Sequence, residues 1–119
     1  MSTIPSDYSV AFVTAPDSKV AKDLAHRLVE QRLVACVNIV PSVTSIYAWE
    51  GEVKEDAEVL MMVKTRTDRM PEVTRFVREN HPYSVAEVIS LPIADGNALY
   101  LEWMGKSVPE AASTKRPSQ

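Results

Sequence analysis

Side chains that could bind a soft metal ion such as Cu(I) are few in this chain and are spread along it. The single cysteine, Cys36, is a soft ligand suited to Cu(I), and a site built on it would need Met61, Met62 or His81 as partners. No CxxC or HxxH spacing is present. A free cysteine is also a common buried hydrophobe, so a purely structural role is the alternative for Cys36.

His81 is followed directly by Pro82 and Tyr83. One interpretation makes it a metal ligand or proton donor in a cleft at the start of a strand. The other makes it the last residue of a helix, where the helix dipole favours a histidine and Pro82 stops the helix. The local sequence allows both.

Two charged residues, Lys64 and Glu87, stand inside apolar segments that read as strands. A buried charge costs several kcal/mol unless it is paired or hydrogen-bonded. The two could pair with each other, within one chain or across a subunit boundary, or either could line a small-molecule pocket. Three aromatic residues, Tyr47, Trp49 and Tyr83, are expected in the core or at an interface between subunits.

The composition excludes several functional classes. The 119-residue chain has a net charge of -3 and no cluster of Lys and Arg, so we expect no nucleic-acid partner. Its three glycines are scattered, and no nucleophile stands beside a histidine in a catalytic signature, so we expect no enzyme. No apolar run approaches the roughly 20 residues of a membrane span, and residues 1–8 do not resemble a signal peptide. We therefore expect a cytoplasmic protein that does not bind membranes.

The first half of the chain predicts a strand, a helix and a long hairpin. Residues 9–15 are a β-branched apolar run, and the helix that follows is capped by Asp17 or Ser18. Its apolar face comprises Ala21, Leu24, Ala25, Leu28 and Val29. Residues 36–49 and 52–66 form the hairpin around Glu50-Gly51, and Pro41 indicates a bulge, a bend or an edge strand.

The second half predicts a helix, a strand and a short last helix. Asp68 is the expected cap of the first of these, whose buried stripe comprises Val73, Phe76 and Val77. Residues 85–93 form the strand, and Asn97 caps the last helix. The polar tail, residues 109–119, is expected to be disordered.

This order, β-α-β-β-α-β-α, predicts one α+β domain, a ferredoxin-like βαββαβ sandwich with an extra C-terminal helix. In that fold both helices cover the same face of the sheet. Residues 59–63 are apolar on both faces of their strand, so the other face also needs cover, and this favours oligomerisation.

Several segments closely resemble the CutA divalent-cation tolerance family. They are Thr14-Ala15-Pro16-Asp17, residues 33–51 (LVACVNIVPSVTSIYAWEG), residues 58–65 (EVLMMVKT), His81-Pro82-Tyr83, Ala86-Glu87-Val88 and Tyr100-Leu101-Glu102-Trp103. The resemblance implies a domain over residues 9–108, after a short extension at residues 1–8. It also implies a PII-like homotrimer linked to tolerance of copper and other divalent cations, with no obligatory cofactor and no known reaction.

The resemblance further implies a cleft between subunits. Its lining would be Lys64, Tyr83 and Glu87 from one subunit, with Tyr47 and Trp49 from a neighbour, and the implied copper ligands are His81 and Cys36. Two residues depart from the family pattern and remove potential ligands. Val13 stands where some bacterial members have cysteine, and Ser84 stands where an acidic residue is usual.

Three functions follow as hypotheses. The first is a metal-tolerance trimer that binds divalent or copper ions weakly. The second is a PII-like sensor that binds a small anionic effector through Lys64. The third is a scaffold in which Lys64 and Glu87 only fasten the subunits together.

Overall fold

Strand β1 (Tyr8–Ala15) runs through the centre of the sheet in the computed structural model, which describes residues 3–112. It pairs antiparallel with β3 (Glu52–Arg66) on one side and with β4 (Val88–Pro92) on the other. Strand β2 (Cys36–Trp49) pairs antiparallel with β3, so the strand order is β2-β3-β1-β4. Together with two helices on one face, this is the ferredoxin-like arrangement that the sequence predicts.

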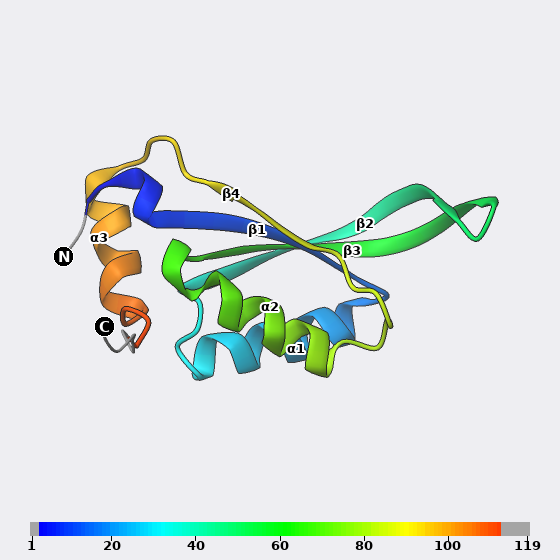
Figure 1. The fold of residues 1–119 in the computed structure, drawn as a ribbon, viewed down its shortest axis with the longest axis horizontal. Coiled ribbons are helices and arrows are strands. Elements are labelled where there is room, and N and C mark those ends of the chain that lie inside the picture. The colour runs from blue at the N-terminus through cyan, green and yellow to red at the C-terminus, as the bar shows by residue number, and fades with distance from the viewer. Residues whose placement is uncertain (1–2, 113–119) are drawn as a thin grey trace, which may run out of the picture.

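Helices α1 (Ser18–Glu30) and α2 (Met70–Asn80) cover one face of the sheet (Figure 1). Of the two predicted caps, Asp17 is the one that caps α1, and it accepts a hydrogen bond from the Val20 N–H at 2.8 Å. The main core joins alternate residues of the central strands to both helices: Ala11, Val13, Ala15, Leu24, Leu28, Val59, Met61, Val63, Val73 and Val77. Val29, which we predicted on the buried face of α1, is instead exposed.

The start of α2 differs from the prediction. Asp68 lies in a 3-10 turn (Thr67–Arg69), and Arg69 occupies the N-cap without a side-chain hydrogen bond. The Asp68 carboxylate accepts instead from the Ala111 N–H at 3.3 Å. The prediction that Asp68 caps α2 is therefore wrong. Its carboxylate binds the backbone of Ala111, near the C-terminal end of the described chain, instead of the first turn of the helix.

The β2–β3 hairpin has the predicted bounds and projects beyond the rest of the molecule (Figure 1). Its turn residues Glu50 and Gly51 have φ of 50° and 81°, the positive values that a tight type I′ turn requires. Val40 pairs with Leu60 and Val43 pairs with Glu58, so two residues of β2 oppose one of β3. This is a β-bulge at Pro41 and Ser42, and β2 is also an edge strand.

Strand β4 is shorter than the predicted range of residues 85–93. Its pairing with β1 ends at Val13 and Val88. Beyond that point the Thr14 carbonyl accepts a hydrogen bond from the His81 ring and not from a backbone N–H of β4. Residues 85–87 therefore form part of the loop that leads from α2 to β4.

The opposite face of the sheet carries no helix and is mainly apolar. Side chains alternate along a strand, so residues between the core positions point to this side. We call it the helix-free face; its apolar members are Val10, Phe12, Val40, Leu60, Met62, Ile89 and Leu91. Ile89 is 57% exposed and Leu91 is 54% exposed. Each therefore leaves about 1 kcal/mol of burial free energy unrealised in a single chain.

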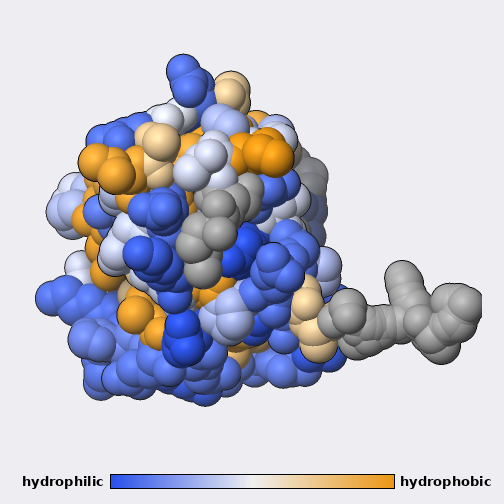
Figure 2. Space-filling view, turned by 90° about the vertical axis from the view of Figure 1, so that its left-hand side faces the viewer, coloured by the Kyte–Doolittle hydropathy of each residue, from blue (hydrophilic) through white to orange (hydrophobic). Residues whose placement is uncertain are grey.

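Helix α3 (Ala98–Ser107) lies at the end of the sheet opposite the hairpin (Figure 1). Asn97 caps it, as predicted, by accepting from the Leu99 N–H. Leu101, Met104 and Val108 pack with Tyr8 in a second, smaller core. Figure 2 shows hydrophobic residues scattered among polar ones over this end. No helix within residues 3–112 is long and apolar enough to cross a membrane.

The guanidinium of Arg66 joins the end of β3 to the end of α3. It is buried and donates hydrogen bonds to the carbonyls of Gly105, at 2.7 Å, and Val108. Arg32 makes similar contacts with the carbonyls of Lys106 and Ser107, but these are exposed. The same helix end is thus held by one buried and one exposed arginine.

We expect Arg66→Met to lower the free energy of unfolding by about 2–4 kcal/mol, because two buried carbonyls lose a charged donor. Arg32→Met is the matched control and should cost only about 0.5 kcal/mol, since water can replace its exposed donors. Urea unfolding followed by circular dichroism measures both. Equal losses in the two variants would contradict the proposed importance of burial.

Candidate functional site

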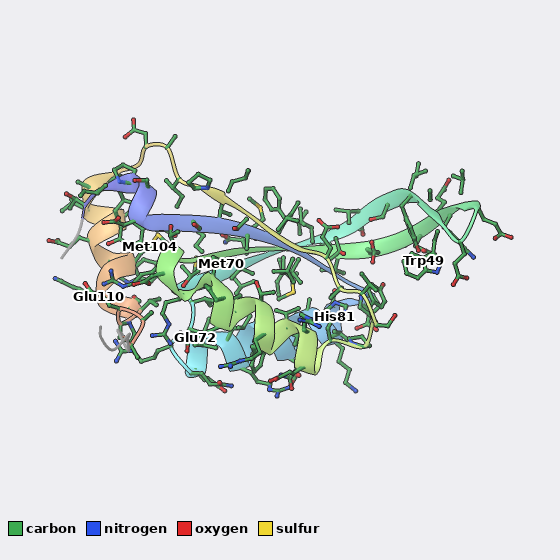
Figure 3. The ribbon with its side chains drawn as sticks, viewed as in Figure 1. Trp49, Met70, Glu72, His81, Met104 and Glu110 are labelled. Carbon is green, nitrogen blue, oxygen red and sulfur yellow. The ribbon has the colours of Figure 1, made fainter. Side chains whose placement is uncertain are left out.

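A groove of about 860 Å³ lies where the hairpin leaves the body of the sheet. It is bounded by the end of β1, by the part of the hairpin beyond Val43 and by the loop after α2. In the view of Figure 3, Trp49 lies on the projecting hairpin and His81 at the end of α2, with that loop between them. The polar and aromatic lining residues are Thr14, Ser45, Tyr47, Trp49, Asp56, Glu58, Tyr83, Ser84 and Glu87.

Four of the five residues that we predicted for a ligand cleft line this groove: Tyr47, Trp49, Tyr83 and Glu87. We expected Tyr47 and Trp49 to come from a neighbouring subunit. They reach the groove from the same chain as Tyr83 and Glu87, so one chain contains all four.

The two groove tyrosines are both hydrogen-bonded to carboxylates. Tyr83 donates its hydroxyl proton to Glu58 at 2.8 Å, and Tyr47 donates to Asp56. Burial, followed by the hydrogen bond to Glu58, raises the pKa of Tyr83 to about 12. The hydrogen bond to Asp56 is the largest cause that raises the pKa of Tyr47 above its ordinary value. Both phenols therefore stay protonated at neutral pH and hold the carboxylates in place.

Asp56 and Glu58 were absent from the predicted site. The turn at Glu50-Gly51 could have identified Asp56, because counting outward from it pairs Trp49 with Glu52, Tyr47 with Lys54 and Ser45 with Asp56. Paired residues share a face, which puts Asp56 diagonally opposite Tyr47. The next step of the same count pairs Val43 with Glu58, still before the bulge, so Glu58 could have been placed on this face in the same way.

His81 is 8% exposed and uses both ring nitrogens within the fold. Nδ1 accepts a hydrogen bond from the Tyr83 N–H at 3.0 Å, so the ring proton is on Nε2, which lies 2.7 Å from the Thr14 carbonyl oxygen. The backbone N–H of His81 also closes the last turn of α2. His81 therefore fixes the path of the loop that carries Tyr83.

The remaining predicted residues, Cys36 and Lys64, are paired across β2 and β3 at the other end of the helix-free face. The Cys36 sulfur lies 3.5 Å from the Tyr100 hydroxyl oxygen, and the Lys64 ammonium lies 5.5 Å from the centre of the Tyr100 ring. Burial, followed by the hydrogen bond with Cys36, raises the pKa of Tyr100 to about 12. This forms a second polar cluster, separate from the groove.

Two pairs of residues that we predicted to lie together are apart within one chain: Lys64 and Glu87, and Cys36 and His81. Lys64 is six positions along β3 from Glu58, about 20 Å, and lies outside the groove lining. Among the described residues it forms no ion pair with Glu87. Cys36 is paired with Lys64, whereas His81 contacts Thr14, whose partner on β3 is Leu60. The two proposed metal ligands therefore lie at least about 13 Å apart along β3. Within residues 3–112, no three ligating side chains gather in a group that could hold a metal ion.

We expect Tyr83→Phe to lower the free energy of unfolding by about 1 kcal/mol at neutral pH, because the buried Glu58 loses its donor. The raised pKa of Tyr83 gives the sign of the pH dependence. Stabilisation by the protonated phenol is fully present below pH 10 and is lost as the pH rises toward 12. The difference between wild type and variant should therefore shrink over that range.

Urea unfolding at a series of pH values measures this difference. Tyr47→Phe is the control, and it should change stability less because its hydrogen bond is exposed. A difference for Tyr83→Phe that stays constant from pH 8 to pH 11 would contradict the assignment.

Comparison with known proteins agrees with this fold. The family model described as "CutA1 divalent ion tolerance protein" matches residues 9–107. The human protein named Protein CutA is 54% identical over 110 residues, which cover 92% of this chain and 61% of the human one. The divalent-cation tolerance protein CutA of Thermus thermophilus is 53% identical over 95 residues, covering 80% of this chain and 92% of its own.

Solved structures give the same result. The crystal structure of CutA1 from Oryza sativa aligns with a TM-score of 0.87 at 45% identity, over 92% of this chain and all of that one. The chain spans about three fifths of the length of the human and mouse relatives. The match of nearly the whole chain to the family model, together with these identities, shows that this chain belongs to the CutA1 divalent ion tolerance protein family.

Proposed function

We propose that this protein contributes to the tolerance of copper and other divalent cations, as a homotrimer that binds the ions weakly and catalyses no reaction. The observation that carries the role is the family match over residues 9–107. The relatives from human, Thermus thermophilus and rice bear the CutA name, and the Thermus protein is described as a divalent-cation tolerance protein.

The helix-free face supports assembly. It exposes Ile89 and Leu91 beside the half-buried Phe12 and Met62, and a monomer would leave these side chains in contact with water. Contiguous exposed apolar surface of this kind marks an interaction site. In a trimer, the apolar helix-free faces of the other two subunits would cover it. Symmetric self-association is the usual solution for such a surface.

Weak metal binding is consistent with the surroundings of His81. An ion bound at either ring nitrogen would displace the Tyr83 N–H or the contact with the Thr14 carbonyl. Loss of such a bond costs about 1–3 kcal/mol, which reduces affinity by one to two orders of magnitude. Cys36 is the second proposed ligand, and Met62 lies on the same sheet face, two residues along β3 from Lys64, the pair of Cys36.

The PII-like sensor hypothesis has less support. It relies on Lys64 to supply positive charge to an anionic effector, and Lys64 lies outside the groove of its own chain. The scaffold hypothesis needs only the apolar face, and it is the outcome if no ion binds. We retain a cytoplasmic location as a proposal, although a CutA structure from Archaeoglobus fulgidus is described as periplasmic.

Assembly through the helix-free face predicts the effect of Met62→Glu. Met62 pairs with Phe12 on one side and Asn38 on the other, near the centre of the face. A buried unpaired carboxylate there should dissociate the assembly into subunits of 13.2 kDa. Native mass spectrometry at about 10 μM measures the mass, and wild type should have three times that of the subunit.

Val29→Glu is the control for this experiment. It places the same charge on an exposed apolar residue of α1, outside the helix-free face, and should leave the trimer intact. A monomeric wild type, or a Met62→Glu variant that stays trimeric, would refute the proposed interface.

The metal-binding proposal is tested by isothermal titration of the assembled protein with Cu(I), Cu(II) and Zn(II). We expect saturable binding at one ion per subunit, with a Kd between about 10 μM and 1 mM. His81→Gln should abolish it, while His26→Gln, a substitution of the other histidine, should not. Cys36→Ser should affect Cu(I) most, because thiolate prefers soft ions.

Unchanged affinity in His81→Gln would remove His81 from the site. No binding tighter than about 1 mM by a confirmed trimer would mean that any role in tolerance is indirect.

A further inference from the structure

The loop between β4 and α3 contains the one aspartate of the chain that is followed directly by a glycine, in Asp95-Gly96. This loop belongs to neither the hairpin nor the helix-free face, and Figure 1 shows it arching away from the sheet. Asp95 and Gly96 are both exposed to solvent. Within residues 3–112 no ion pair involves Asp95, so no cationic side chain holds its carboxylate.

The Asp95 carboxylate lies against the backbone of the next residue. The N–H of Gly96 donates a hydrogen bond to Asp95 Oδ1 at 2.8 Å. The carboxyl carbon Cγ is one C–O bond, about 1.2 Å, from that oxygen, so the Gly96 nitrogen lies within about 4 Å of it. Bond formation needs the two reacting atoms about 3–3.5 Å apart, which a small rotation of the Asp95 side chain provides. Gly96 has no Cβ to shield its nitrogen.

Asp17 is a useful comparison, because it is also exposed and is followed by a small residue, Ser18. Its carboxylate is engaged differently: it accepts from the Val20 N–H, three residues further on, and caps α1. Ser18 is the first residue of that helix. The cap and the regular backbone hold the Asp17 side chain at the helix end, whereas nothing comparable holds Asp95.

We propose that Asp95-Gly96 is a site of spontaneous covalent modification, at which Asp95 converts to isoaspartate through a cyclic imide. In the first step the Gly96 nitrogen bonds to Cγ of Asp95. A carboxyl oxygen leaves as water, taking the amide proton and one proton from solvent. In the second step a water molecule opens the ring. Opening at Cγ restores aspartate, and opening at the main-chain carbonyl of Asp95 gives isoaspartate. Water is the only co-reactant.

The modification lengthens the main chain by one methylene between two fixed points. On one side the Ile93 N–H donates to the Tyr8 carbonyl at 2.9 Å. On the other side Asn97 caps α3 by accepting from the Leu99 N–H at 3.0 Å. Only residues 94–96 lie between them, so the added length displaces the cap. Loss of an N-cap raises the opening of a helix about fivefold. Isoaspartate at this position therefore loosens α3 and the smaller core beneath it.

The test incubates the assembled full-length protein at neutral pH in water enriched in ¹⁸O, and then digests it in ordinary water for mass spectrometry. Each passage through the imide introduces one ¹⁸O atom, and we expect this label at Asp95 and not at Asp17. Asp-N protease cleaves before aspartate but not before isoaspartate, so a growing fraction of chains should stay uncut before Asp95. In that fraction the amides of α3 should exchange with deuterium about fivefold faster, and those of α1 should not.

Two variants should change the rate in opposite directions. Gly96→Ala should slow labelling at least about tenfold, because a Cβ shields the attacking nitrogen. That Cβ would lie 3.4 Å from the Leu101 side chain, an ordinary contact, so the variant should fold. Asp95→Asn should form the imide at least about tenfold faster, because ammonia leaves an amide more readily than water leaves a carboxylate. Its product also gains a negative charge, which isoelectric focusing detects.

Three results would overturn this inference. They are the absence of label at Asp95, an undiminished rate in Gly96→Ala, and equal labelling of Asp17 and Asp95. The first would mean that the folded loop prevents cyclisation, and the other two would mean that glycine and the local geometry do not direct it. None of these measurements involves a metal ion, so the proposed role in cation tolerance is judged separately by the titrations.

Discussion

The groove depends on one extra residue in strand β2. Side chains alternate between the two faces of a sheet, so an insertion of one residue exchanges the faces for everything that follows. Before the bulge, Val37 and Ile39 point toward the helices and pack on the core. Without the bulge, Tyr47 and Trp49 would continue that parity and lie on the helix side. With it, they share a face with Asp56 and Glu58 of β3.

The same bulge divides the hairpin into two parts with different partners. Its inner part belongs to the sheet and obtains its stability from the core beneath α1 and α2. Its outer part, beyond Val43, has cross-strand pairs and the turn to hold it, and most of its side chains are exposed. An isolated two-stranded ribbon is only marginally stable in water. The hydrogen bonds of Tyr47 and Tyr83 add support where the outer part meets the loop.

Local patterns were sufficient to predict the element order, the hairpin bounds and the caps at Asp17 and Asn97. They failed where a distant part of the chain decides the structure. Asp68 does not cap α2 because its acceptor is used by Ala111, and β4 begins late because His81 contacts Thr14. For the site, single-residue reasoning identified the aromatic residues and Glu87. It also grouped Lys64 with them, in a cleft between subunits; within one chain Lys64 lies outside the groove, at the end of β3 that pairs with Cys36.

Both described ends of the chain lie at the end of the molecule that bears α3, away from the hairpin (Figure 1). The segment around Ser6 contacts Thr67, and residues 109–111 contact Arg69 and Asp68, so entry and exit share one corner. Additional sequence attached at either point would leave from that corner. Extra residues at either point, as in a longer related protein or in a fusion protein, would therefore not obstruct the groove of the same subunit.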